Sequence, residues 1–128
     1  MIHGNPTWSF YFRSLIKYLS PEFRTIAPDH IGCGLSGKPD SSGYDYRLKS
    51  RVDDMDLFLS RLKLTGGISL ILHDWGGMIG MAYAVKNPEK ISSVVIMNSA
   101  AFFPPGGKMK IPLRLRVIRN ISPLANIA

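Results

Sequence analysis

The chain has 128 residues, 45% of them hydrophobic and 20% charged, with a formal net charge of +7. This size and composition predict one soluble globular domain with one core. No apolar run approaches the ~20 residues of a membrane span and Met1 opens no signal peptide, so we expect no membrane span and a cytoplasmic location. The single cysteine, Cys33, excludes an internal disulfide and is interpreted as a small packed side chain.

Elements expected to be helical and extended alternate along the chain. The apolar residues Trp8, Phe12, Leu15, Ile16 and Leu19 share one helical face, and Ser20-Pro21 ends that helix. Residues 23–27 are expected to form a short strand, and residues 28–40 a loop dense in Gly and Pro. The cleanest amphipathic helix covers residues 48–62, a buried strand follows at 68–72, and a further buried strand is expected at 92–98.

The alternation of these elements predicts an α/β fold, a doubly wound parallel sheet with flanking helices. Met1-Ile2 is expected to be the end of a strand that leads into the His3-Gly4 turn. After residues 103–107 the pattern changes to a stretch with five basic and no acidic residues, which are Lys108, Lys110, Arg114, Arg116 and Arg119. This stretch holds much of the charge imbalance and no nucleic-acid motif accompanies it, so we interpret it as a solvated face and expect no nucleic-acid partner.

The strand at 68–72 is followed at once by a helix, expected over residues 75–85, whose first turns are rich in glycine. Gly76, Gly77 and Gly80 would let this helix lie close against the sheet. Asp74 stands at the turn, where a sharp change from strand to helix aims a side chain out of the sheet edge, beside the positive helix N-terminus. The alternative is that Asp74 only caps the helix, a common position for Asp.

Three segments together resemble the α/β-hydrolases with an aspartate nucleophile, the group of haloalkane dehalogenases and epoxide hydrolases. They are residues 3–8, 28–36 and 73–77, in this order, and the resemblance runs from His3 to about Phe103. Within the group the chain most resembles the dehalogenase-related β-lactone decarboxylases of bacterial olefin biosynthesis. The similar features are Asn5, the Tyr44-Asp45-Tyr46 segment before residues 50–54, and residues 98–102.

The resemblance implies a role for three residues. Asp74 would be the catalytic nucleophile, because an ionised carboxylate can open a C–halogen, epoxide or strained lactone bond without a base, giving an enzyme ester. The backbone N–H groups of Asn5 and Trp75 would form the oxyanion hole for hydrolysis of that ester, and their side-chain N–H groups would bind the leaving group. Asn5 could instead shape a turn before Pro6, and Trp75 could fill the core at a helix start.

In this family the catalytic histidine follows the last strand, and no histidine follows Asp74 in the 128 residues. His3 and His30 are expected to hold loops together, and His73 to make a structural hydrogen bond on the opposite side of the strand. We therefore interpret residues 1–107 as a partial α/β-hydrolase core and residues 108–128 as the truncated start of a cap domain, together an internal fragment of a longer enzyme.

The expected partner is a small hydrophobic substrate, a haloalkane or β-lactone, with no cofactor and no metal. A partner enzyme is implied only if the protein works in an olefin pathway. We expect the 128-residue chain alone to show no turnover. Two alternatives remain. One is an epoxide hydrolase, which requires cap tyrosines to protonate the epoxide, whereas Tyr44, Tyr46 and Tyr83 lie outside the cap. The other is a non-catalytic binding protein that retains the fold.

Overall fold

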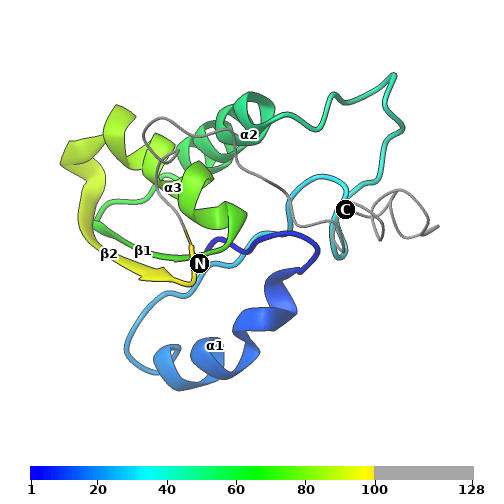
Figure 1. Cartoon of the computed structure of the whole chain (residues 1–128). Helices are drawn as coiled ribbons and strands as arrows, with labels where there is room; N and C mark the ends of the chain where they lie inside the picture. Colours follow the sequence, from blue (N-terminus) through cyan, green and yellow to red (C-terminus); the bar gives the residue numbers. More distant parts are fainter. Residues whose placement is uncertain (100–128) are drawn as a thin grey trace.

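The computed structural model describes residues 1–99, and the expected start of a cap at 108–128 lies outside the described residues. Two short 3-10 helices, three α-helices and two strands follow one another in the described part (Figure 1). They are η1 (Ser9–Phe12), α1 (Arg13–Leu19), α2 (Leu48–Arg61), β1 (Ile68–His73), α3 (Trp75–Lys86), η2 (Pro88–Lys90) and β2 (Ile91–Met97). The three predicted helices and the strands at 68–72 and 92–98 are thereby confirmed.

The sheet is parallel and centred on β1. β2 pairs with one edge of β1 in a register that sets Leu72 opposite Ile96. On the other edge, Ile2 forms a parallel bridge to Leu72, with its N–H 2.8 Å from the Ile71 oxygen and its own oxygen 3.1 Å from the His73 nitrogen. Met1-Ile2 therefore lies extended beside β1 and leads into the His3-Gly4 turn, but it forms an isolated bridge and not a strand of its own.

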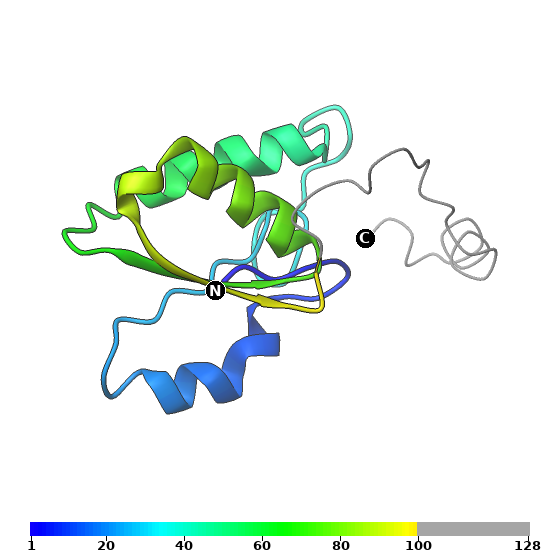
Figure 2. The ribbon, with the colours of Figure 1, turned by 60° about the vertical axis from the view of Figure 1, so that its left-hand side comes forward.

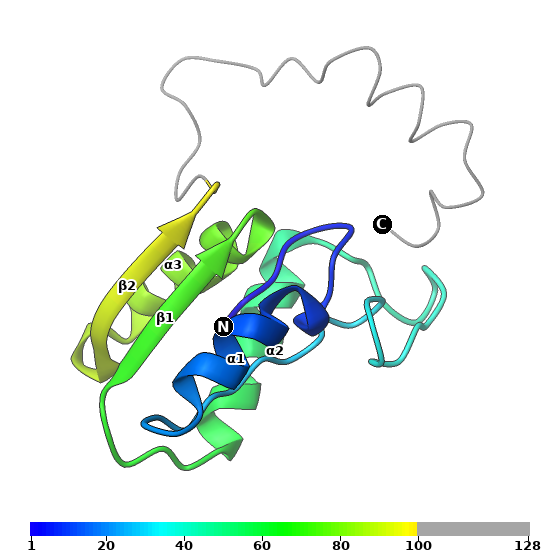
Figure 3. The same ribbon diagram turned by 90° about the horizontal axis from the view of Figure 1, so that it is seen from below.

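Helices cover both faces of this sheet, which is the doubly wound arrangement expected. α1 lies on one face, while α2 and α3 lie together on the other (Figures 2 and 3). Between α2, α3 and β1 the apolar side chains form one core, with Ile2, Val52, Met55, Leu70, Leu72 and Ile79 buried at its centre. The periodic apolar face of α2 and the buried strand β1 supply most of it, so burial of these side chains fixes the fold around the β1–α3 turn.

Glycines allow α3 to approach the sheet as closely as the sequence predicts. A Cβ at Gly76 would collide with the backbone oxygen of Ile2, and one at Gly80 with the Leu72 side chain. The start of α3 therefore packs closely against Met1-Ile2 and β1.

Two predictions about extended segments are wrong. Residues 23–27 form no strand: this segment receives one hydrogen bond, from the Met1 amino group to the Ile26 oxygen at 2.7 Å, and a strand needs a ladder of such bonds. β2 is not buried, because Val94, Val95 and Ile96 are all exposed in the described structure. α3 packs on α2 and β1, and this leaves the apolar residues of β2 without a cover among residues 1–99.

None of the helices within residues 1–99 has the length and apolar character needed to cross a bilayer. The same residues contain no cluster of three or more His, Cys, Asp or Glu side chains that could bind a metal ion.

Candidate active site

Asp74 occupies the sharp turn between β1 and α3. Its backbone has φ 51° and ψ −122°, a conformation that favours glycine and costs other residues about 1–3 kcal/mol. The side chain makes no capping hydrogen bond to α3, so the capping alternative does not describe this residue. Its half-buried carboxylate instead projects from the end of β1 at the helix N-terminus, the arrangement expected of a nucleophile elbow.

The turn after the first extended segment meets this carboxylate. The backbone N–H of Asn5 donates a hydrogen bond to Asp74 Oδ1 at 2.8 Å. Gly4 lies so close that a Cβ at this position would overlap the Asp74 side chain. Residues 69 positions apart in the chain are thus brought into contact, and one carboxylate oxygen is held by a backbone donor. No other N–H within residues 1–99 bonds to that carboxylate, including the N–H of Trp75.

Asn5 and Trp75 border one small cavity beside this contact. The cavity has a volume of about 10 Å³ and is lined by Gly4, Asn5, His30, Cys33, Arg51, Trp75 and Ile79. Trp75 is 37% exposed, so it does not fill the core. The Cys33 thiol donates to Asn5 Oδ1 at 3.9 Å. A space of this size holds about one water molecule, so it is too small to be a whole substrate pocket.

Cys33 is buried, as expected of a small packed side chain. Burial raises the pKa of its thiol, which keeps the group neutral and unreactive near pH 7.

The loop that contains residues 28–38 is folded around Asp29. Its two carboxylate oxygens accept the N–H groups of Ser9 at 2.7 Å and Leu35 at 2.8 Å. Burial works to raise the pKa of Asp29, but these hydrogen bonds outweigh it and hold the pKa below its usual value. Asp29 therefore ties this loop to the start of η1, next to the Asn5 turn.

All three histidines of the sequence are engaged away from the Asp74 carboxylate. His3 and His30 are buried and bonded to each other, so the prediction that they hold loops together is confirmed. The predicted structural hydrogen bond of His73 is not found among the described residues. Its ring is stacked on Tyr11 at 4.2 Å between centroids, and its buried Nδ1 has no partner there. None of the three rings forms a hydrogen bond with the Asp74 carboxylate.

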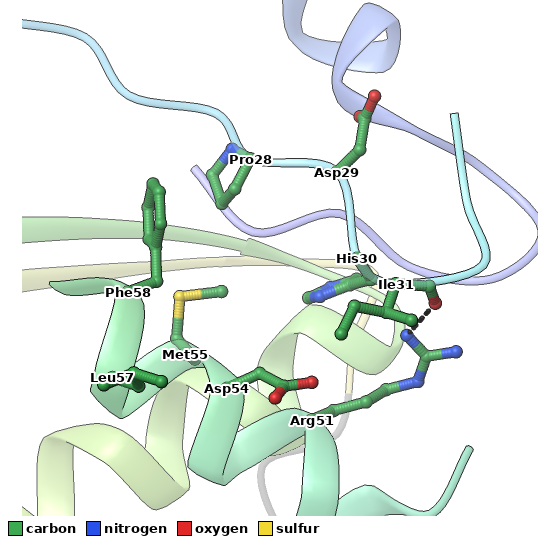
Figure 4. Close-up of a pocket in the computed structure, with 9 residues that line it drawn as sticks. All are labelled: Pro28, Asp29, His30, Ile31, Arg51, Asp54, Met55, Leu57 and Phe58. Atoms are coloured by element: carbon green, nitrogen blue, oxygen red, sulfur yellow. Dashed lines mark hydrogen bonds between the residues drawn. The ribbon is translucent and has the colours of Figure 1, made fainter. Parts of the chain in front are cut away.

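A larger cavity, of about 270 Å³, lies between α2 and residues 28–31 (Figure 4). Its wall is mostly apolar and includes Met55, Leu57 and Phe58, with Asp54 and Arg51 at one end. Neither Asp74, Asn5 nor Trp75 lines it. Chemistry at the Asp74 carboxylate requires contact with that group, so we do not place the reacting bond in this cavity.

Sequence reasoning missed Arg51. Its side chain is buried although it belongs to the amphipathic helix α2, it donates to the Ile31 oxygen at 2.9 Å, and it lies over the Tyr46 ring at 5.7 Å. A signal was present, because Arg51 is next to Val52 on the apolar face of α2. An arginine in such a place indicates a polar partner across the interface.

The comparison with known families agrees with this architecture. Residues 1–122 match the model of a family described as the alpha/beta hydrolase fold. The chain belongs to this family.

Two kinds of enzyme are found among the similar proteins. The chain is 54% identical over 120 residues to the cis-3-alkyl-4-alkyloxetan-2-one decarboxylase of Shewanella oneidensis, covering 94% of this chain and 37% of that protein. It is 40% identical over 99 residues to haloalkane dehalogenase 2 of Mycobacterium tuberculosis, covering 77% of this chain and 34% of that protein. The chain thus spans about a third of the length of the curated relatives that it matches.

Solved structures show the same grouping. A mutant of the haloalkane dehalogenase DatA from Agrobacterium tumefaciens superposes with a TM-score of 0.70 at 34% identity, over 77% of this chain and 32% of the other. The epoxide hydrolase CorEH superposes with a TM-score of 0.73 at 27% identity, over 91% of this chain and 40% of the other. The resemblance to the dehalogenase-like α/β-hydrolases is therefore confirmed.

Proposed function

We propose that this chain carries the nucleophile and part of the oxyanion hole of a haloalkane dehalogenase-like enzyme, with residues 1–107 as its core and residues 108–128 as the start of its cap. The observation that carries the proposal is the hydrogen bond from the Asn5 N–H to Asp74 Oδ1, at a strained strand-to-helix turn. This bond holds Oδ1 and leaves Oδ2 as the attacking oxygen. The substrate would be small and hydrophobic.

In the proposed reaction the Oδ2 lone pair forms a bond to an electrophilic carbon. With a haloalkane, the C–halogen bond breaks and the halide leaves with the bonding electrons. With a β-lactone, the attacked atom is the saturated ring carbon that carries the ring oxygen, the bond between these two atoms breaks, and the oxygen stays in the product as part of a carboxylate anion. Either product is an ester on Asp74, and the leaving anion is stabilised by the side-chain N–H groups of Asn5 and Trp75.

The higher identity to an oxetanone decarboxylase than to a dehalogenase favours a β-lactone as the substrate. The epoxide hydrolase alternative requires tyrosines in the cap to protonate the epoxide. Tyr44 donates instead to Asp54, Tyr46 donates to the Pro39 oxygen, and Tyr83 is buried in α3. None of these three tyrosines belongs to the expected cap at 108–128, so we rank this alternative below the β-lactone and haloalkane hypotheses.

Hydrolysis of the ester needs a histidine that activates water, and the three histidines of these 128 residues are engaged elsewhere. The isolated chain should therefore stop at the ester. Incubation with a bromoalkane should raise its intact mass by one alkyl group and release one equivalent of bromide. A β-lactone should add its whole mass.

The matched variants are Asp74→Asn and Asp56→Asn, which change two half-buried aspartates, only one of them at the elbow. Asp74→Asn should stay unmodified and Asp56→Asn should react like the unchanged chain. Undiminished modification of a folded Asp74→Asn chain would remove the nucleophile from the proposal. A folded chain that reacts with neither electrophile would favour the non-catalytic binding protein.

A further inference from the structure

His3 and His30 are bonded to each other in both directions beneath the Asn5 turn. The backbone N–H of His30 donates to His3 Nε2 at 3.1 Å, and His30 Nε2 lies 3.1 Å from the His3 carbonyl oxygen. The ring centroids are 4.3 Å apart, and the His3 side chain is fully buried. Each residue thus binds the other through one ring nitrogen and one backbone group.

These bonds fix which nitrogen carries the proton on each ring. His3 Nε2 accepts a hydrogen bond, so it carries no proton, and the proton is on Nδ1, which donates to the Gly4 oxygen at 2.8 Å. His30 Nε2 faces a carbonyl oxygen, so it is the protonated nitrogen of that ring. A second proton on His3 would face the His30 N–H, so the interlocked pair requires a neutral His3 ring.

The His3 bond acts on the same peptide unit that holds the Asp74 carboxylate. The Gly4 oxygen and the Asn5 N–H belong to one planar trans peptide, in which these two groups point in opposite directions. Three donors hold the oxygen: His3 Nδ1 at 2.8 Å, Thr7 Oγ1 at 2.8 Å and the Thr7 N–H at 3.1 Å. Because the oxygen is fixed, the N–H at the other end is aimed, and it is bonded to Asp74 Oδ1.

We propose that His3, interlocked with His30, is the positioning residue that aims the Asn5 N–H at the Asp74 carboxylate. Its importance for catalysis rests on the proposed function, but the positioning itself is a property of the fold. His3 touches no substrate in this role. Donors on the Gly4 oxygen also polarise the peptide, which strengthens the opposite N–H as a donor.

The charged and titratable groups that face the pair come from three elements. Asp29 lies on the 28–38 loop, Arg51 on α2 and His73 on β1. Burial lowers the pKa of His3 and lowers that of His30 to about 4, the charge of Arg51 adds to both shifts, and the Asp29 carboxylate opposes them. Both rings are therefore neutral near pH 7, the state that the interlocked geometry requires.

The test reads the ring protons and the Asn5 amide directly by NMR of the ¹⁵N-labelled chain. Long-range ¹H–¹⁵N correlations at pH 7 should show the proton of His3 on Nδ1 and that of His30 on Nε2. In His3→Leu the Asn5 amide proton should lose its downfield shift and exchange with water about tenfold faster, as expected for the loss of one hydrogen bond.

Two variants control this result. His3→Asn places an amide nitrogen near the position of Nδ1, so it should keep the Gly4 bond and restore the Asn5 amide. His73→Leu, which changes a histidine whose Nδ1 has no partner within residues 1–99, should leave the Asn5 amide protected.

The proposal is overturned if His3 carries its proton on Nε2, if the Asn5 amide of His3→Leu is unchanged, or if His3→Asn protects it no better than His3→Leu does. Should His3→Leu fail to fold, the ring-proton assignment and His3→Asn still decide, because an unprotected Asn5 amide in folded His3→Asn contradicts the role. A chain that passes this test but forms no ester would retain the positioning and lose the proposed function.

Discussion

At the scale of single residues, the main finding is that Asp74 has an unfavourable backbone at the one position where a reactive carboxylate is proposed. Its φ of 51° lies in a region that L-residues with a Cβ avoid. The contacts around it hold it there, since Gly4 packs against its side chain and Gly77 donates to its oxygen at 3.0 Å. The fold therefore sustains local strain at the proposed nucleophile.

Relief of this strain can be measured by comparing two variants that both lack the carboxylate. Asp74→Gly should be more stable than Asp74→Ala by about 1–2 kcal/mol, because glycine adopts a positive φ without steric cost. Urea unfolding followed by circular dichroism gives the difference. Equal stability of the two variants, or a more stable Asp74→Ala, would show that the turn is not strained.

The buried histidines predict a loss of stability in mild acid. The pKa of His30 is lowered from 6.5 to about 4 by burial, so between these values the unfolded chain binds a proton that the folded chain does not. The free energy of unfolding should therefore fall as pH falls from 6.5 to about 4, by about 3 kcal/mol for His30, and this contribution should level off below that range.

The measurement is the free energy of unfolding of the unchanged chain and of His30→Gln at several pH values between 7 and 4. Gln has no proton to gain in this range, so the variant should lack most of the acid-dependent loss. If the free energy of unfolding of His30→Gln falls with pH as steeply as that of the unchanged chain, other groups cause the loss of stability in acid.

At the scale of elements, the approach of α3 to the extended segments decides where the carboxylate is displayed. Gly76→Ala should destabilise the fold by about 1–3 kcal/mol, because its Cβ would collide with the Ile2 backbone oxygen, which cannot turn away as a flexible side chain would. Gly66→Ala is the matched control, since nothing lies within 4 Å of a Cβ there. Thermal unfolding compares them, and equal melting temperatures would contradict the close approach.

The sequence predicted elements best where periodicity and packing agree. The apolar repeat of α2 and the glycines of α3 were enough to place both helices, because these patterns follow from burial. Residues 23–27 have strand-like composition but lack a bonded ladder, and the exposure of β2 depends on what packs against it. Both depend on tertiary neighbours, which local sequence does not encode.

The candidate site was predictable in part for the same reason. Asp74 stands at a junction that strand and helix signals define locally, and the resemblance pointed to Asn5 and Trp75. The bond between Asn5 and Asp74 joins distant residues, as does the interlock of His3 with His30, and only the fold brings these together. The stacking of His73 on Tyr11 was likewise invisible, because alternation along a strand gives the side of a residue and not its partner.

At the scale of the whole molecule, these 128 residues contain the proposed means to form an ester and no histidine placed to hydrolyse it. Formation and hydrolysis are separate steps with separate requirements, because an ionised carboxylate attacks unaided while water needs a base. Each chain should therefore react once.

The most direct measurement is peptide mapping by tandem mass spectrometry of the folded chain after incubation with a bromoalkane. The sequence has nine Asp and Glu side chains, any of which could in principle carry the alkyl group. We expect a single ester, on Asp74, that is absent when the chain is unfolded before incubation. An ester spread over several carboxylates, or found at another residue and not at Asp74, would contradict it.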